Sequence, residues 1–201
     1  MHMKIRGNTF LFSAMVGAAM LSTSPISSAH DEGQFVMKNS MLERPTGYRE
    51  WVYVGTPVTP NDMNDGKAAF PEFHNVYIHP DSWEHWKTKG EFPDGTIIVK
   101  ELVSVGGKSA PSGNGYFMGD FIGLEAVLKS KKYFPKEPGN WAFFSFTMPD
   151  HESLKSDAKA FPTDACNSCH QSNAATDWIF TQYYPVLRDA KKMGHDGTYG
   201  R

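Results

Sequence analysis

The residues best suited to chemistry in this sequence stand together near its C-terminus, as Cys166-Asn167-Ser168-Cys169-His170. Two thiols three positions apart, followed at once by an imidazole, are typical of the attachment site of a c-type haem. Each thiol would form a thioether with a haem vinyl group, and His170 would supply an axial nitrogen to the iron. Because the chain has no other cysteine, the motif predicts one covalent haem c per chain.

Two other uses of a cysteine pair fit the sequence less well. A zinc site would need one or two more ligands, and no second Cys or His pair stands at a helpful spacing. A thioredoxin-type pair would be expected early in the chain, after a first strand and at the start of a helix. Haem attachment is therefore the favoured interpretation.

Residues 1–29 are predicted to form a secretory signal peptide. Lys4 and Arg6 precede an apolar run at 10–21, and small residues ending at Ala29 suit a cleavage site. The apolar run is short for a membrane span, although an uncleaved anchor is the alternative. We expect a soluble protein exported to the periplasm.

The charge of the chain gives no reason to expect nucleic acid or an anionic membrane as a partner. The 20 Lys and Arg residues face 22 Asp and Glu, and removal of Lys4 and Arg6 leaves 18 basic residues and a net charge near −4. Aromatic residues make up 13% of the chain, which suits a core around a large, flat, apolar cofactor.

The sequence after the signal peptide predicts an α+β fold rich in β-structure. Residues 30–47 are expected to be an irregular N-terminal arm, followed by one domain over 48–201. Strands are predicted from aromatic and β-branched residues at 48–54, 75–78, 96–105, 121–129 and 141–147. Helices are predicted at 82–89 with Asp81 as N-cap, at 152–160 and at 174–190, the last interrupted or kinked at Pro185. We expect an antiparallel sheet, a few short helices and a C-terminal haem-binding helical segment.

The sequence leaves open what binds the second side of the iron. An electron-transfer haem has two strong axial ligands, whereas a haem that binds or transforms small molecules keeps one face open. The candidate ligands are Met118, Met148, Met193 and His195. Methionine beside strands is more often core than ligand, so an open site is favoured.

Charged residues inside two of the predicted strands allow two interpretations. Lys100 alternates with Ile98 and Leu102, Glu101 lies on the other face of that strand, and Glu125 lies opposite an apolar row. They could be rim charges on a half-exposed sheet. Alternatively, an amine and a carboxylate could lie near the haem, where burial would tune their affinity for protons.

Several stretches of the chain resemble the cytochrome P-460 family, the exported mono-haem c proteins of ammonia- and methane-oxidising bacteria. Together they run from about Tyr48 to Leu187, and VKELVSVG combined with SGNGYFMGD is the most specific part. The similar stretches are YREWV at 48–52, TPNDMNDGKAAF at 59–70, GEFPDGTIIVKELVSVG at 90–106, SGNGYFMGDFIGLEA at 112–126, EPGNWAFF at 137–144 and the haem motif.

The resemblance implies a β-rich fold that usually forms a homodimer, with His170 as proximal ligand and an open distal face. In the enzymatic branch of the family a lysine is joined covalently to the haem macrocycle, and its position in the VKEL stretch matches Lys100. A distal carboxylate that handles protons matches Glu125. A basic pocket residue falls at His74, where the family pattern would lead us to expect arginine. His74 is therefore a candidate for the pocket or a structural histidine.

The activity implied by the resemblance is oxidation of hydroxylamine to nitric oxide or nitrous oxide, with the electrons passing to a periplasmic c-type cytochrome. The main alternative is the sister branch, cytochrome c′-beta, which binds nitric oxide without turnover under an aromatic cap. Candidates for such a cap are Phe70, Phe73, Phe92, Phe117 and Phe121. Lys100 together with Glu125 favours the enzyme. An electron carrier with a Met ligand is the third possibility.

Overall fold

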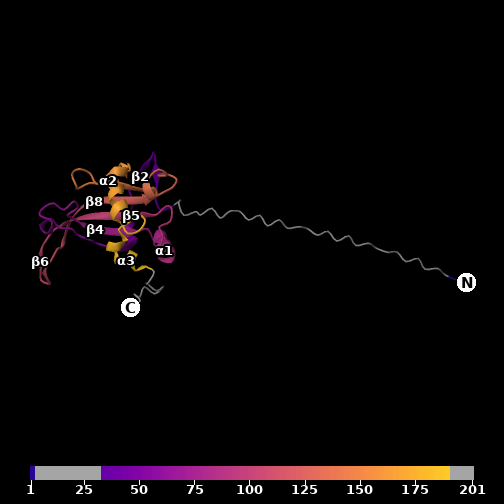
Figure 1. Ribbon diagram of the computed structural model, residues 1–201, viewed down its shortest axis with the longest axis horizontal. Coiled ribbons are helices and arrows are strands. Elements are labelled where there is room, and N and C mark those ends of the chain that lie inside the picture. The colour runs from indigo at the N-terminus through magenta and orange to yellow at the C-terminus, as the bar shows by residue number, and fades with distance from the viewer. Residues whose placement is uncertain (3–32, 191–201) are drawn as a thin grey trace.

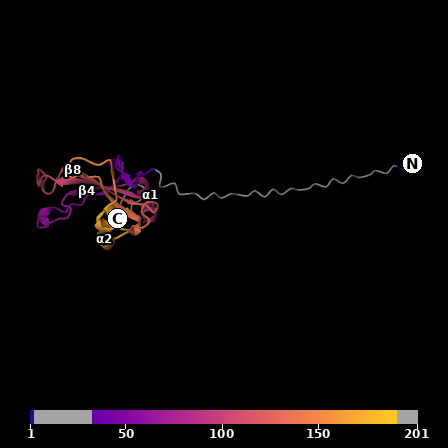
Figure 2. The same cartoon turned by 90° about the horizontal axis from the view of Figure 1, so that it is seen from above.

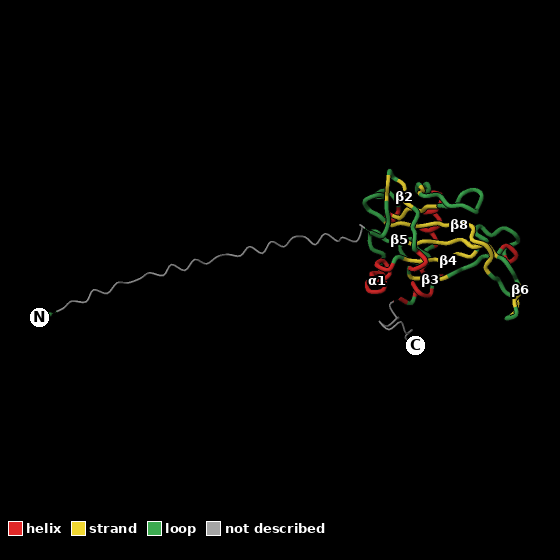
Figure 3. Tube along the Cα trace, turned by 180° about the vertical axis from the view of Figure 1, so that it is seen from behind, coloured by secondary structure: helices red, strands yellow, loops and turns green. Residues whose placement is uncertain are grey.

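A five-stranded antiparallel sheet forms the centre of the protein (Figures 1 and 3). The structure is a computed structural model, and it describes residues 1–2 and 33–190. The strand order is β3-β4-β5-β8-β9. The strands span Val52–Gly55 (β3), Phe73–Ile78 (β4), Ile97–Val105 (β5), Met118–Lys129 (β8) and Trp141–Ser145 (β9).

The middle strand, β5, is apolar on both faces because both faces of the sheet are covered. Ile97 and Val99 are fully buried on one face, and Ile98 and Leu102 are buried on the other. Side chains alternate between the two faces along a strand. The position of each charged residue along β5 therefore decides which layer of the protein its side chain meets.

Helices and the C-terminal segment cover the face that contains Ile98 (Figure 2). The helices are α1 (Pro80–Lys89), α2 (Thr163–Asn173) and α3 (Pro185–Arg188). The core on this face contains Val54, Val76, Ile78, Trp83, Trp86, Phe92, Ile98, Trp141, Ile179, Leu187 and Ala190. We call this the helical face of the sheet.

A small three-stranded sheet covers part of the opposite face. It consists of β1 (Met37–Lys38), β2 (Met41–Glu43) and β10 (Asp157–Ala158), in the order β1-β2-β10. The core on this face contains Leu42, Ile97, Val99, Leu124, Ala126, Leu128, Ala142, Phe144, Phe146 and Ala158. The residues expected to be an irregular arm therefore contribute two short strands and the fully buried Leu42.

A short hairpin of β6 (Ser109–Ala110) and β7 (Gly113–Asn114) extends the connection between β5 and β8 at the edge of the molecule (Figure 1). Two side chains flanking the hairpin bind Asp62, which lies in the loop before β4. The Lys108 ammonium lies 2.5 Å from Asp62 Oδ2, and the Tyr116 hydroxyl donates to Asp62 Oδ1 at 3.0 Å. The hairpin and the loop are thereby joined.

The predicted fold class is confirmed, and several element boundaries need correction. The strand expected at 48–54 begins only at Val52, because Tyr48–Glu50 forms a 3-10 turn (η1) whose side chains bind Glu101. Helix α1 begins at Pro80 rather than after Asp81. Proline is favoured at the first helical position, which explains why the helix begins at Pro80. His79 is the N-cap, and its Nδ1 accepts the Asp81 N–H at 3.3 Å.

The helix predicted at 152–160 is wrong. The Asp150 carboxylate accepts the backbone N–H groups of Glu152 and Ser153, which closes a local turn, and an antiparallel bridge between Thr147 and Leu154 keeps the following residues extended. Beyond this turn, the Lys155 N–H donates to Phe146 O, and the chain continues into β10.

The long helix predicted at 174–190 is also wrong. Asp177 and Trp178 have φ of +47° and +59°, outside the helical region. Only the 3-10 turn Thr181–Tyr183 (η4) and the short α3 are helical there. The stable helix of this region is α2, one segment earlier.

Among the described residues, no helix is long and apolar enough to cross a membrane. The predicted signal peptide, apart from residues 1–2, lies outside the described residues, as do Met193 and His195.

Candidate functional site

Helix α2 contains the whole Cys-X-X-Cys-His motif. Cys166 and Cys169 are three residues apart and His170 is four residues after Cys166, so the three side chains share one side of the helix. Both cysteines are free thiols, with Cys166 partly buried and Cys169 exposed. Asn167, on another side of α2, is buried and donates to Glu137 Oε2 at 3.1 Å and to Trp141 O at 3.3 Å. The helix is thereby fixed to the sheet.

The His170 ring has a defined orientation. Its Nδ1 lies 2.7 Å from the backbone carbonyl oxygen of Trp178, and the ring packs between Phe143 and Phe180 at centroid distances of 4.4 and 4.7 Å. A carbonyl can only accept, so Nδ1 carries the hydrogen and Nε2 keeps its lone pair. Burial lowers the pKa of His170, which favours the neutral imidazole that metal ligation requires.

Lys100 and Glu125 lie on the same face of the sheet as His170. They are direct cross-strand partners in the β5–β8 pair, and Lys100 Nζ lies 2.6 Å from Glu125 Oε2. About a quarter of each side chain is exposed, 26% and 27%. After desolvation, which has the largest effect, their charges also act on the pKa values of Cys166 and His170. The structure therefore places a cross-strand pair near a motif that lies 41 (Glu125 to Cys166) to 70 (Lys100 to His170) positions further along the chain.

His74 joins this group from the neighbouring strand β4. It is two residues from Val76, the cross-strand partner of Lys100, and so shares the helical face. Its Nε2 lies 3.4 Å from Glu72 Oε1, and only 14% and 12% of the two side chains are exposed. Burial raises the pKa of Glu72, but the contact with His74 and a backbone hydrogen bond outweigh it, and the net pKa is lowered.

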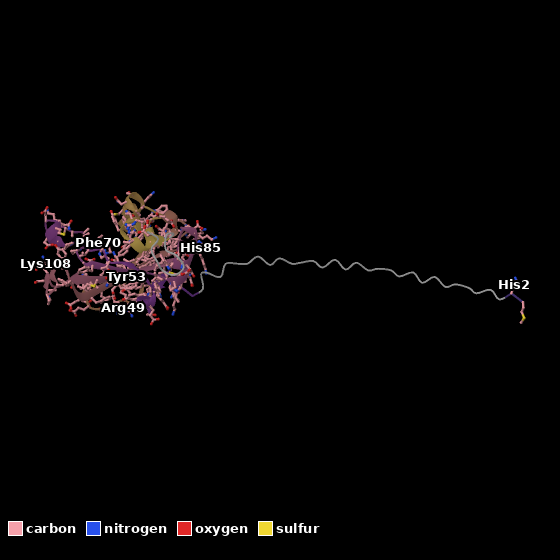
Figure 4. All side chains as sticks on the ribbon, turned by 90° about the horizontal axis from the view of Figure 1, so that it is seen from below. His2, Arg49, Tyr53, Phe70, His85 and Lys108 are labelled. Atoms are coloured by element: carbon pink, nitrogen blue, oxygen red, sulfur yellow. The ribbon has the colours of Figure 1, made fainter. Side chains whose placement is uncertain are left out.

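Phe70 adds an aromatic ring beside these charges. Lys100 Nζ lies 5.0 Å from the centre of the Phe70 ring, and the ring is 6.1 Å from that of His74. Figure 4 places Phe70 on the side of the sheet that faces the gold C-terminal ribbon. Of the other phenylalanines considered for a cap, Phe92 is buried against Trp86 and Trp141. Phe121 packs against the core of the opposite face.

Glu101 is buried on the opposite face and belongs to a different network. Its carboxylate accepts hydrogen bonds from Tyr48 at 2.9 Å, from Asn75 at 3.1 Å and from Arg49. Figure 4 places Arg49 on the side away from Phe70. Of the two adjacent charges in β5, Lys100 therefore meets the helical layer and Glu101 does not.

The two candidate axial methionines within the described residues, Met118 and Met148, are not brought together with His170. Met118 lies on the opposite face, where its sulfur is 3.9 Å from Asn75 Nδ2. Met148 lies in the turn after β9, and its N–H donates to Ser153 O at 3.1 Å.

Four groups of the site were not predicted from the sequence: Glu72, Phe143, Phe180 and the carbonyl of Trp178. Glu72 could have been found from its position two residues before His74, since alternate residues of an extended segment share a face. His170 contacts the backbone oxygen of Trp178, and a backbone oxygen is present in every residue. The residue type at position 178 therefore does not indicate this contact.

Comparison with known proteins assigns this arrangement to a family. The family model for cytochrome P460 matches residues 45–181, which include the sheet and the Cys-X-X-Cys-His motif. The chain belongs to the cytochrome P460 family. It is therefore a cytochrome, with a haem cofactor. No individual curated protein matches the chain.

The residues of this P460 cytochrome fit a haem. Two free thiols and an imidazole with a fixed Nδ1–H form a donor set of the kind that holds haem c. In addition, the indole Nε1–H of Trp178 is buried and has no hydrogen-bond partner within the described residues. An unpaired buried donor is costly, and a bound group with acceptor atoms would satisfy it.

Proposed function

We propose that this cytochrome is a periplasmic, mono-haem c enzyme that oxidises hydroxylamine to nitric oxide or nitrous oxide. The observation that carries the proposal is the Lys100–Glu125 pair, 2.6 Å apart on the face of the sheet against which His170 of α2 packs. An electron carrier has no use for a proton-accepting carboxylate at this position. An enzyme that removes protons and electrons from a small nitrogen compound does.

In this proposal, four residues hold the haem. Cys166 and Cys169 would form the thioethers, His170 would ligate the iron through Nε2, and Lys100 would form a further covalent link to the macrocycle. That link would replace one N–H and one macrocycle C–H bond, and an external two-electron oxidant would take up the two hydrogens. The bound haem would supply the oxidising equivalents, and a periplasmic c-type cytochrome would accept the electrons. The fixed Nδ1–H of His170 supports its part of the assignment.

Glu125 is the proposed proton acceptor for bound hydroxylamine. Its present partner is the ammonium group of Lys100. If the Lys100 nitrogen is consumed in a link to the haem, the amine no longer carries a full positive charge and the carboxylate loses its counter-ion. Formation of the link would then leave Glu125 free to accept a proton.

His74 and Glu72 are proposed to carry protons onward from Glu125. Glu72 contacts His74 and also lines a hollow of about 320 Å³ together with Asp62, Ser104 and Lys108. The pair therefore connects the surroundings of Lys100 with an open surface. An imidazole has two ring nitrogens and can pass a proton from one side to the other, whereas a guanidinium cannot be deprotonated in a protein. His74 therefore suits this role better than the arginine expected from the family pattern.

One observation favours the alternative, a cytochrome c′-beta-like protein that binds nitric oxide without turnover. Phe70 lies beside Lys100 and His74 and could act as an aromatic cap. The two functions differ in whether Lys100 and Glu125 take part in chemistry. We retain the enzyme as the proposal because both residues are present and paired.

A turnover assay separates the two functions. The purified, haem-loaded protein would be mixed with hydroxylamine and an artificial one-electron acceptor, while acceptor reduction and the release of nitric and nitrous oxide are followed. The enzyme predicts multiple turnovers with gas release. Tight binding of nitric oxide without hydroxylamine-dependent reduction of the acceptor would contradict the enzyme and support the alternative.

A homodimer in solution is also proposed, and sedimentation would test it.

A further inference from the structure

The backbone carbonyl that contacts His170 belongs to a turn of unusual conformation. Thr176 and Ile179 form an antiparallel bridge, with the Ile179 N–H donating to Thr176 O at 2.9 Å. Between them, Asp177 and Trp178 both have positive φ. Turns of this kind favour Asn and Gly, and a bulky residue such as Trp in the left-handed region is strained unless its surroundings hold it there.

The side chain of Asp177 is held from the sheet by two donors. Lys129 Nζ lies 2.7 Å from Asp177 Oδ2, and Trp141 Nε1 donates to Asp177 Oδ1 at 3.2 Å. Lys129 and Trp141 are cross-strand partners in the β8–β9 pair. Lys129 Nζ also donates to Phe92 O at 2.9 Å. Both side chains that donate to Asp177 thus come from one cross-strand pair of the sheet.

The ring of Trp178 rests against a glycine. A Cβ built on Gly139 would lie 2.6 and 2.8 Å from two ring atoms of Trp178, closer than real carbon atoms approach. The indole therefore occupies the space that any other residue at position 139 would fill. Asp177 is fixed by charge and Trp178 by packing. These two independent contacts together hold the Trp178 carbonyl in its direction toward His170.

We infer that Lys129 and Asp177 are positioning residues that tune the haem through His170. Lys129 holds Asp177, Asp177 fixes the turn, and the turn aims the Trp178 carbonyl at His170 Nδ1. A hydrogen bond accepted from Nδ1–H increases the electron density of the ring and strengthens Nε2 as a donor. A stronger axial donor stabilises the oxidised iron, so the pair keeps the haem reduction potential low.

This inference rests on the proposed ligation of haem by His170. It goes beyond that proposal because Lys129 and Asp177 touch neither the haem ligands nor the groups proposed to move protons. The side chains are largely buried, with 15% and 23% exposed. An ion pair at this position is screened less by solvent than one on the surface.

The test uses the full-length, haem-loaded protein and two readouts other than activity. These are the midpoint potential of the haem and the iron–histidine stretching frequency of the ferrous form in resonance Raman spectra. The variants are Lys129→Met and the nearly isosteric Asp177→Asn, which keeps the shape of the site should Lys129→Met fail to fold. Lys87→Met is the matched control, since it breaks a Lys–Glu pair of 2.8 Å on α1.

We expect both variants to raise the midpoint potential and to lower the stretching frequency, while Lys87→Met matches the wild type. Lys129→Arg, which keeps a charged donor, should return both values toward wild type. If Lys129→Met and Asp177→Asn match the control while the wild type shows an iron–histidine band, the inference is overturned and haem ligation stands. If the wild type lacks that band, both the ligation and the inference fail.

Discussion

Lys100 and Glu125 face each other across β5 and β8, with 2.6 Å between Nζ and Oε2, on the face of the sheet against which His170 of α2 packs. The pair is only about one quarter exposed, so neither charge is an ordinary rim charge. The proposed chemistry depends on this pair more than on the Cys-X-X-Cys-His motif, because the motif would hold a haem in any of the functions considered.

Replacing Glu125 should separate haem binding from turnover. Glu125→Gln keeps the size of the side chain but removes the proton acceptor. We expect the rate of hydroxylamine oxidation to fall about 100-fold or more, with haem content unchanged. Steady-state kinetics and haem absorbance would measure both. Glu84→Gln, on the exposed surface of α1, is the control. Equal rates for the two variants would remove Glu125 from the mechanism.

Substitutions at His74 test whether an imidazole is needed. His74→Ala should lower the rate by roughly 10-fold or more if His74 passes on protons from Glu125. Glu72→Gln should have a smaller effect in the same direction, since it removes the carboxylate charge 3.4 Å from His74 but keeps an amide that can hydrogen-bond the ring. Rates measured between pH 5 and 8 would provide the comparison. His74→Ala with wild-type rates throughout would assign His74 a structural role.

The buried Glu101 carboxylate should make stability depend on pH on the acid side. Burial would raise its pKa, but hydrogen bonds from Asn75, Arg49 and Tyr48 outweigh burial and lower the pKa below its usual 4.5. A group with a lowered pKa in the folded state stabilises the protein above its unfolded pKa. That contribution is lost as the pH falls toward the folded value.

The comparison for this prediction is Glu101→Gln, which should be less stable than wild type by about 1–3 kcal/mol at pH 7. We expect the difference in free energy of unfolding, measured in urea, to shrink as the pH falls below about 4.5. A difference that stays constant with pH would show that the ionisation of Glu101 is not linked to folding.

The packing of Trp178 on Gly139 predicts a second stability effect. Gly139→Ala places a Cβ within 2.6 Å of the indole at a residue with φ of +60°, so the Trp178 ring or the turn must shift. We expect a loss of about 1–3 kcal/mol in the free energy of unfolding. Gly66→Ala is the control, because Gly66 has φ of +73° and no atom within 4 Å of the added Cβ. Equal losses would mean that the contact with Trp178 adds nothing to the strain of positive φ.

The composition of β5 was enough to predict a strand at the centre of the sheet, because β5 is rich in β-branched residues, which are enriched in strands. Alternation in β5 also separated Lys100 from Glu101. It could not show which face would receive α2, because both faces of the strand are apolar and both are covered. The face that meets His170 is set by the chain after β9, far away in the sequence.

The C-terminal region was predicted least well, and the reason is local. Residues 174–190 contain helix-forming residues, yet Asp177 is held by Lys129 and Trp141, and these contacts favour a tight turn over a helix. Contacts of this kind join positions 36 to 48 residues apart, and no pattern within the segment reports them. Glu72 was within reach of the sequence analysis, since it stands two residues before His74.

The covalent state of Lys100 is the most direct test of the account. The intact mass and visible absorption spectrum of the purified protein should be recorded beside those of Lys100→Arg. We predict that the wild type contains one covalent haem, that its mass lacks the hydrogens lost in forming the lysine link, and that its spectrum is strongly red-shifted. The mass of Lys100→Arg should equal that of the chain with an unlinked haem c, with no hydrogens missing, and its spectrum should be that of an ordinary haem c. An ordinary haem c mass and spectrum in the wild type would contradict the account.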